Sequence, residues 1–245
     1  MASTWSSSDL FALVEGPWKE DYLIKRILPE DLSRVLEHVR THFLQDEPTC
    51  NLLLTQRRRR RREKEGCSNN TDQLLFEEEI QSLVRIVVRD ELSFLVEDVN
   101  TGELAAIRIT YRSTKATDFP IFSSPCMKEL FRLTNLLEKE ANLFEKFGVG
   151  EIARFFIASC TPKYRRRGIT TELYRRSLIF LKASGFRLAE SMFTNPFTRC
   201  CAVKFGFQEV VRIEYKDYRN ENDDGFVFRG ESSQHHFAAI MVKVL

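Results

Sequence analysis

A cluster of basic residues around one glycine is the part of the sequence best suited to hold an anion. It reads Arg165-Arg166-Arg167-Gly168-Ile169-Thr170 and stands between a dense apolar run, 153–159, and a segment with helical spacing. A helix start exposes unpaired backbone N–H groups and the positive end of the helix dipole, and glycine lets a ligand approach that backbone closely. Arginines add forked donors for phosphate oxygens. The segment therefore predicts a pyrophosphate site.

Two common nucleotide-binding loops are absent from this turn. A Walker A loop needs GxxxxGK and a Rossmann turn needs GxGxxG, and the sequence contains neither. A basic turn before a helix is also a common feature of solvated protein surfaces. The turn thus indicates an anion-binding helix start, and further motifs are needed to identify the anion.

A carboxylate at a helix end is the candidate proton acceptor. Apolar residues recur at helical spacing from Leu32 to Phe43, and the helix is expected to end within Gln45-Asp46-Glu47-Pro48, because a proline pushes the residue before it out of the α region. A carboxylate at such a helix end can accept a proton or attract a cation. The alternative is that Glu47 only solvates a turn.

Strands and helices alternate along the rest of the chain in the pattern of a single α/β domain. The expected strands are 22–28, 94–99, 104–109, 153–159 and 239–244, with a hairpin turn at Gly102. A helix is expected over 128–147, ended by Gly148, and another from Gly168 to Gly185. We expect residues 1–20 to be an N-terminal extension and 21–245 to form the domain.

Composition excludes several classes of protein. The 245 residues are 43% hydrophobic and 29% charged with a net charge of +2, which argues against a disordered chain or a strongly basic nucleic-acid tail. No apolar stretch is long enough to span a bilayer, and the first ten residues lack the layout of a secretory signal. The sequence therefore predicts a cytoplasmic protein without a membrane partner.

The six cysteines include no CxxC pair, and two of them are adjacent. This pattern suits neither a zinc site nor a disulfide framework, so we expect reduced thiols and no metal. Six arginines, Arg57 to Arg62, lie in a basic and polar segment, 57–72, that should be an exposed loop or helix because adjacent like charges cannot be buried. Nucleic-acid binding by this run is the less favoured alternative.

Two motifs together point to a family. Arg165-x-x-Gly168-x-Thr170 resembles the acetyl-CoA signature of the GNAT acyltransferase superfamily, with Thr170 in place of the usual Gly or Ala, and Val203-Lys204-Phe205-Gly206-Phe207 resembles its second signature. The resemblance implies a central mixed, mostly antiparallel sheet with helices on both faces. It also implies acetyl-CoA as co-substrate, with its pantetheine arm in a gap between two strands along Ile157 to Cys160. Ser159, Cys160 and the basic turn would then contact it.

Further segments narrow the resemblance to invertebrate arylalkylamine N-acetyltransferases. They are Gln45 to Pro48, Tyr164-Arg165, Phe193 to Asn195, Gly206 to Val210, Ile213 to Tyr215, Asp217-Tyr218 and Ala239 to Val244. The resemblance implies direct attack of a dopamine, serotonin, tyramine or octopamine type of amine on the thioester, with Glu47 as general base. Thr194 and Thr198 fall where that family has two relay serines, whereas Ala202 stands where many GNAT enzymes have a tyrosine.

Other functions stay open at this stage. A related pocket would fit agmatine, polyamines or longer acyl-CoA donors, and abundant phenylalanines suit an aromatic amine. They include Phe43, Phe119, Phe122, Phe193 and Phe197. A catalytically weak CoA-binding module that recruits RNA or an acidic partner through Arg57 to Arg62 is the rival, favoured by the threonines at 170, 194 and 198. Cys160 has no nearby histidine in sequence, which favours direct transfer over an acyl-cysteine.

Overall fold

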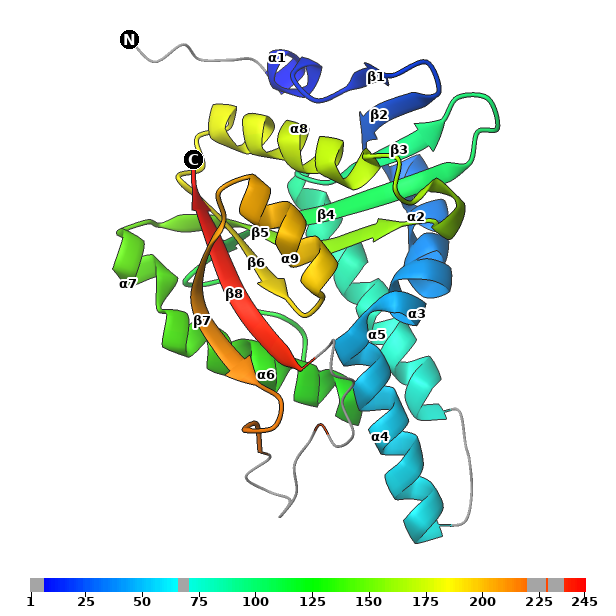
Figure 1. Cartoon of the computed structure of the whole chain (residues 1–245), viewed down its shortest axis with the longest axis vertical. Helices are drawn as coiled ribbons and strands as arrows, with labels where there is room; N and C mark the ends of the chain where they lie inside the picture. Colours follow the sequence, from blue (N-terminus) through cyan, green and yellow to red (C-terminus); the bar gives the residue numbers. More distant parts are fainter. Residues whose placement is uncertain (1–6, 66–70, 220–227, 229–235) are drawn as a thin grey trace.

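A single eight-stranded sheet runs through the molecule in the order β1-β2-β3-β4-β5-β6-β8-β7 (Figure 1). The computed structural model describes residues 7–65, 71–219, 228 and 236–245. All neighbouring strands are antiparallel except β5 and β6, which are parallel. The strands are β1 Gly16–Trp18, β2 Tyr22–Arg26, β3 Phe94–Asp98, β4 Leu104–Thr114, β5 Glu151–Cys160, β6 Leu188–Phe193, β7 Gln208–Glu214 and β8 Phe237–Val244. The predicted mixed, mostly antiparallel sheet is confirmed.

Helices cover both faces of this sheet. The α-helices are α1 Ser7–Ala12, α2 Leu32–His38, α3 Leu44–Asp46, α4 Pro48–Glu65, α5 Thr71–Val87, α6 Pro125–Ala141, α7 Leu143–Phe147, α8 Ile169–Ala183 and α9 Pro196–Lys204. A π-helical segment, Val39–Phe43, joins α2 to α3, and 3-10 turns lie at Pro29–Asp31, Val88–Asp90 and Pro162–Tyr164. Among the helices described, none has both the length and the apolar character to cross a membrane.

Two hydrophobic cores lie on opposite faces of the sheet. The first packs α2, α4, α5 and α6 against side chains such as Ile107 and Ile157. The second packs α1, α8 and α9 against side chains such as Ala106 and Phe155. Ile107 and Ala106 are successive residues of β4, and successive side chains of a strand point to opposite faces. The helices that carry Glu47 and those that carry the basic turn are therefore separated by the sheet.

Local signals placed five of the eight strands, but they did not indicate β1, β6, β7 or helix α5, and one helix break was missed. The hairpin of β3 and β4 is confirmed, and Gly102 in its turn has φ +70°, a value that favours glycine. The expected helix 128–147 is wrong in its continuity. It divides into α6 and α7 because Asn142 adopts a left-handed conformation with φ 42° and caps α6. Gly148 ends α7 as expected.

The part of the expected N-terminal extension that is described, 7–20, folds onto the domain. Phe11 and Val14 are buried in the core beneath α8, and β1 pairs with β2. The buried guanidinium of Arg176 in α8 donates to the backbone oxygens of Val14, Gly16 and Pro17 at 2.6, 3.3 and 3.0 Å. This strand therefore lies against the helix that follows the basic turn.

The first arginines of the 57–62 run lie in helix α4. Arg57 donates from Nε to Asp72 Oδ2 at 3.1 Å, and Arg58 donates to the side chain of Gln73. Both acceptors belong to the first turn of α5, so these contacts join the two long helices. Of the two expected forms, loop or exposed helix, the helix is correct for residues 57–65.

Candidate active site

Strand β5 loses one of its two neighbours halfway along its length. It pairs with β4 from Glu151 to Cys160, but its parallel pairing with β6 covers only Ala153 to Phe155. Beyond that point β6 continues as a partner of β8 while β5 continues beside β4 (Figure 1). The expected gap is therefore present, and residues 156–160 form one of its edges.

A bulge accompanies this separation. The register between β4 and β5 shifts where Ile109 pairs with Ile157 and Thr110 pairs with Phe155, so that Phe156 is the extra residue. A bulge bends a strand and increases its local twist. The bulge thus lies at the residue where β5 leaves β6, which is where a change in strand direction is needed to open a gap.

The basic turn lies directly after this free half of β5. Gly168 has φ +88° and occupies the N-cap position of α8, and a Cβ there would come 3.7 Å from the Trp18 ring. Gly168 has no side chain that could cover the first backbone N–H groups of α8. Arg167 donates to the Tyr22 hydroxyl at 3.0 Å. The exposed turn thus presents a helix N-terminus with fixed positive charge.

The remaining residues of the turn differ in their surroundings. Arg166 is exposed with φ 63°, a left-handed conformation that bends the chain sharply ahead of the helix. Ile169 is buried in the core under α8, and Thr170 is half-buried in the first turn. Of these three residues, Arg166 and Thr170 have side chains that a ligand at the helix start can contact.

Arg165 links the turn to the helix end that carries Glu47. Its Nε donates to the backbone oxygen of Cys160 at 3.1 Å, and its guanidinium pairs with the carboxylate of Asp46. Both members of the ion pair are nearly half exposed, so the net stability it contributes is small. The ion pair instead has a positioning role, because it holds the end of β5 beside the Asp46-Glu47 segment.

Glu47 lies at the junction of α3 and α4 in an extended conformation with ψ 117°. Its Oε2 accepts from the backbone N–H of Cys50 at 2.5 Å, so it caps α4, and Pro48 suits the first helical position. Its Oε1 accepts from the Thr194 hydroxyl at 2.5 Å. Glu47 is half-buried and therefore reachable. A carboxylate held by two donors in this way has a fixed orientation.

The two threonines expected to form a relay have different partners. Thr194 is 8% exposed, directly follows β6 and contacts Glu47. Thr198 in α9 donates its hydroxyl proton to the backbone oxygen of Asn195 at 3.0 Å. Asn195 is the N-cap of α9, because its side chain accepts from Phe197 N at 2.8 Å. The structure thus brings one of the two threonines to the candidate base.

Ser159 and Cys160 lie on opposite faces of the free half of β5. Cys160 pairs with Ala106 and faces α8, whereas Ser159 pairs with Ile107 and faces α2. Burial raises the pKa of the Cys160 thiol to about 11. A thiol with that pKa is protonated at neutral pH and is a poor nucleophile.

A histidine that the sequence did not associate with the site lies against Ser159. Nε2 of His38, in α2, is 3.0 Å from Ser159 Oγ. The two residues are 121 positions apart, as Asp46 and Arg165 are 119 apart, so no local motif links them. The amphipathic pattern of the helix placed His38 on it, but its partner depends on how the helix packs against the sheet.

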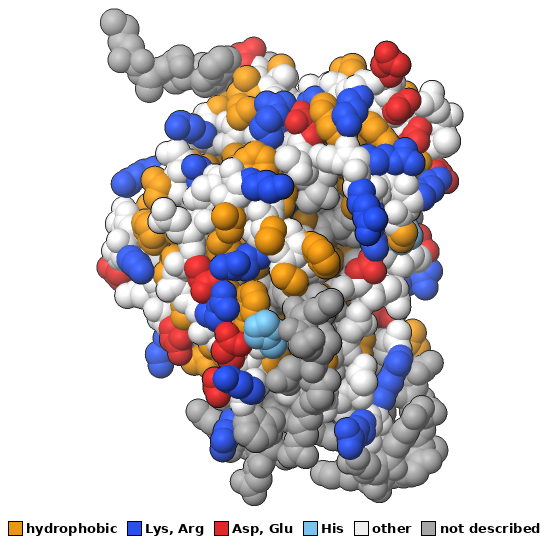
Figure 2. Space-filling view, in the orientation of Figure 1, with side chains coloured by type: hydrophobic (Ala, Val, Ile, Leu, Met, Phe, Trp, Pro, Cys, Tyr) orange, Lys and Arg blue, Asp and Glu red, His pale blue; other side chains and the backbone are white. Residues whose placement is uncertain are grey.

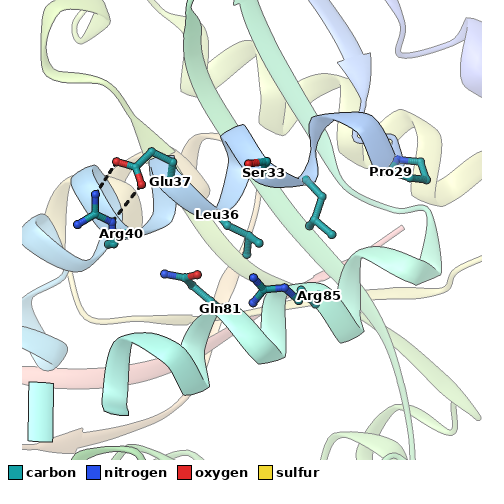
Figure 3. A pocket seen from close by; sticks show the side chains of 8 residues that line it. Pro29, Ser33, Leu36, Glu37, Arg40, Gln81 and Arg85 are labelled. Atoms are coloured by element: carbon teal, nitrogen blue, oxygen red, sulfur yellow. Dashed lines mark hydrogen bonds and ion pairs between the residues drawn. The ribbon is translucent and has the colours of Figure 1, made fainter. Parts of the chain in front are cut away.

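A separate hollow lies between α2 and α5 (Figure 3). It is lined by residues of α2, the adjoining π-helical segment and α5, including Glu37, Arg40, Gln81 and Arg85 (Figure 3). Arg40 is engaged by Glu37 through two hydrogen bonds of 3.0 and 2.7 Å. This hollow does not include the candidate site residues described above.

Comparison with known proteins identifies the architecture. No protein-family model matches the sequence. Arylalkylamine N-acetyltransferase 2 from Aedes aegypti is similar in structure, with a TM-score of 0.75 and 21% identity over 91% of this chain and 98% of that one. A mosquito arylalkylamine N-acetyltransferase like 5b gives a TM-score of 0.72 and 18% identity over 91% and 100% of the two chains.

A polyamine N-acetyltransferase from Drosophila melanogaster, which forms N-acetylagmatine, gives a TM-score of 0.69 and 13% identity over 92% of this chain and all of its own. These likenesses cover nearly the whole length of each protein, so they concern the complete architecture and not a shared fragment. The chain therefore has the fold of the GNAT N-acetyltransferases.

Proposed function

We propose that this protein is an acyl-CoA-dependent N-acetyltransferase that acts on small primary amines of the arylalkylamine class. One observation carries the proposal: the gap between β5 and β6 has the anion-binding helix start of Gly168 beside it and the oriented carboxylate of Glu47 at its end. The first feature suits a diphosphate and the second suits a protonated amine. An acyl-transfer site needs both in reach of one opening.

The turn around Gly168 would hold the acyl donor. The first N–H groups of α8 have no partner within the helix, and the exposed side chain of Arg166 adds positive charge beside them. These groups match the charge and donor pattern of a pyrophosphate. Ser159 and Cys160 on the free half of β5 would contact the pantetheine end. When bound, acyl-CoA supplies the thioester carbonyl that the amine attacks.

Glu47 would act as the general base. An alkyl ammonium loses one proton to the carboxylate, the free amine forms the C–N bond, and the C–S bond breaks. The second proton of the nitrogen neutralises the departing thiolate, and Glu47 then returns its proton to solvent. The hydrogen bonds from Thr194 and from Cys50 N fix the carboxylate without using all its lone pairs.

Thr194 would hold this base in place, and it can pass a proton to the leaving group only after its own hydrogen bond to Glu47 opens. Its hydroxyl lies on Glu47, whereas the hydroxyl of Thr198 is engaged by the helix backbone. We therefore assign the stronger role to Thr194. A transfer through Thr198 requires that its bond to Asn195 O first opens.

An aromatic amine is the favoured acceptor, with polyamines second. Phe43 lies one helical turn before Glu47, whose N–H donates to the Phe43 oxygen at 2.9 Å, and its ring packs at the edge of the core on this face of the sheet. Phe119 and Phe122 instead pack on Phe131, with centroid distances of 5.6 and 4.3 Å. The likeness to the Drosophila polyamine enzyme keeps agmatine in the candidate set.

A thiol-release assay tests the proposal. The full chain is incubated with acetyl-CoA and, in separate reactions, tyramine, dopamine, serotonin, agmatine and spermidine. We expect amine-dependent release of CoA, fastest with an arylalkylamine. Faster release with agmatine or spermidine would reassign the acceptor class, and no release with any amine would contradict the enzymatic function.

The rival, a CoA-binding module that recruits RNA, receives less support from the described residues. Arg57 and Arg58 are engaged by Asp72 and Gln73 of the same chain. On the face that carries α8 and α9, Lys and Arg side chains are interspersed with acidic and apolar ones (Figure 2). Salt-sensitive RNA retention without turnover would favour this rival.

A further inference from the structure

The side of the gap that faces Glu47 carries a second polar pair, formed by Ser159 and His38. Ser159 Oγ and His38 Nε2 are 3.0 Å apart. Ser159 is half-buried on the free half of β5, whereas His38 is 4% exposed within α2. One member of the pair thus reaches the gap, and the other supports it from the core.

His38 is held in its neutral form. Burial, with a smaller contribution from His42, lowers the pKa of His38 to about 3. The two imidazole rings meet edge to face at 4.8 Å, which fixes the plane of His38. A neutral imidazole keeps one nitrogen free as a hydrogen-bond acceptor. It can therefore accept a hydrogen bond from a hydroxyl group, and it does not compete with Glu47 for the proton of the substrate.

Ser159 and Glu47 lie at the same end of the gap. Arg165 contacts the carbonyl of Cys160, the residue after Ser159, and also the carboxylate of Asp46, the residue before Glu47. Ser159 points to the α2 face of the sheet, because its strand partner Ile107 belongs to the core on that face. An amine that reaches Glu47 from this face therefore approaches Ser159 as well.

We propose that Ser159 is a second hydrogen-bond acceptor for the amine substrate, that His38 is the residue that orients it, and that the pair selects primary over secondary amines. The inference rests on the proposed acetyltransferase function. In the tautomer that carries its proton on Nδ1, His38 accepts a hydrogen bond at Nε2 from the Ser159 hydroxyl, which leaves the lone pairs of Oγ for the substrate. A primary amine has two N–H groups and a lone pair. One N–H is held by Glu47 and the other by Ser159, which aims the lone pair at the thioester carbon.

A secondary amine cannot make both contacts, because one of its hydrogens is replaced by carbon. The loss of one hydrogen bond to a fixed acceptor costs roughly a tenfold factor in rate. The pair therefore adds selectivity that the Glu47 carboxylate alone does not supply. No covalent step is assigned to Ser159, and its hydroxyl keeps its proton throughout.

The test compares the best primary amine found in the thiol-release panel with its N-methyl form. In the wild type we expect kcat/KM to be roughly tenfold higher for the primary amine. Ser159→Ala should lower kcat/KM for the primary amine about tenfold more than for the N-methyl amine, so that the ratio falls toward one whatever the effect on acetyl-CoA binding. Ser159→Thr keeps the hydroxyl and should keep the ratio.

His38→Phe tests the positioning role. It should reduce the same ratio by a smaller factor, about threefold, because an unoriented hydroxyl still accepts a hydrogen bond part of the time. Ser113→Ala is the matched control, since Ser113 is a buried serine of β4 paired with Ile152, at the other end of β5. Acetyl-CoA affinity and melting temperature are measured for every variant to separate a folding defect from a change of selectivity.

Two results would overturn the inference while leaving the acetyltransferase function intact. The first is turnover in Ser159→Ala with an unchanged ratio between the two amines. The second is an acetyl group on Ser159 after incubation with acetyl-CoA alone, detected by mass spectrometry of the peptides, which would make Ser159 a nucleophile. Absence of turnover by the wild type with every amine would instead contradict the proposed function itself.

Discussion

The two halves of strand β5 belong to one continuous strand but have different surroundings. The first half, to Phe155, has β4 on one edge and β6 on the other. Beside it Arg154 is buried, paired with Glu138 and lying 3.4 Å from Glu190 of β6. The second half keeps only β4, and its other edge faces the gap. There Cys160 O is held by Arg165 and Ser159 by His38.

The difference indicates how one strand serves two purposes. Backbone pairing on both edges and the burial of Arg154 beside Glu138 and Glu190 hold the first half closed. The second half leaves a backbone edge free, and the contacts around it come from side chains of distant elements. The closed half thus stabilises the sheet, and the open half carries the proposed active site.

The largest expected effect comes from removing the base at the open end. Glu47→Gln keeps the size of the side chain and its ability to cap α4 through an oxygen, but it cannot accept a proton. We expect kcat at neutral pH to fall by about a thousandfold, within the usual range for general bases. The measurement is amine-dependent thiol release.

Glu37→Gln is the matched control for that experiment. Glu37 is an exposed glutamate of the neighbouring helix α2 and is paired with Arg40. It should leave kcat unchanged within about twofold, as expected for an exposed ion pair. If Glu47→Gln keeps full activity, Glu47 is not the general base, and another group must accept the proton of the amine.

The closed half should show its burial as a pH dependence of stability. Burial raises the pKa of Glu190 from 4.5 to about 7, with Arg154 opposing the shift. Between about pH 4.5 and 7, Glu190 is therefore protonated in the folded protein and ionised in the unfolded chain. The contribution of Glu190 to the free energy of unfolding is complete below this window and is lost as the pH rises through it.

Chemical denaturation at several pH values tests this prediction. The difference in free energy of unfolding between wild type and Glu190→Gln should fall by about 2 to 3 kcal/mol from pH 4.5 to 7. The variant has no proton to lose at this site and serves as the reference. A difference that stays flat across the window would mean that Glu190 is ionised throughout and that the closed half is held by a permanent ion pair.

A substitution at the basic turn should affect ligand binding more than folding. Gly168→Ala places a side chain at φ +88°, which strains the backbone and shifts the first amides of α8. We expect the Kd for acetyl-CoA to rise about tenfold, which calorimetry would detect. Gly102→Ala, at φ +70° in the β3–β4 turn, should be similarly destabilising but should bind acetyl-CoA normally. Equal affinities for both variants would contradict the assignment of the turn.

The smallest predicted effect separates the two threonines. Thr194→Val removes the donor to Glu47 with little change of shape, and kcat should fall about fivefold for the loss of one hydrogen bond. Thr198→Val removes a hydroxyl that is bonded to its own helix, so kcat should change by less than about twofold. The opposite ranking would restore Thr198 as the main relay residue.

Features specified by neighbouring residues were predictable from the sequence. The strand 153–159 and the helix after Gly168 were predicted from apolar density and from the glycine at the helix start, and the structure confirms both. The end of the helix at Glu47 was predicted from Pro48, because proline restricts the residue before it. The gap itself followed from the family resemblance and not from any local pattern.

Features that depend on packing were not predictable. The pair of His38 and Ser159 joins a helix to a strand, and nothing in the spacing of either segment indicates the other. The same holds for Asp46 and Arg165. Helix 128–147 was expected to be continuous because its apolar stripe continues past Asn142, but the left-handed conformation of that residue ends the hydrogen-bond ladder.

Calorimetric titration of acetyl-CoA into the purified full chain tests the central claim most directly. If the turn at Gly168 and the free edge of β5 form an acyl-CoA site, heat should be released on binding, with one molecule bound per chain, and binding should weaken in Gly168→Ala but not in Gly102→Ala. Folded protein that gives no heat of binding with acetyl-CoA would contradict the account.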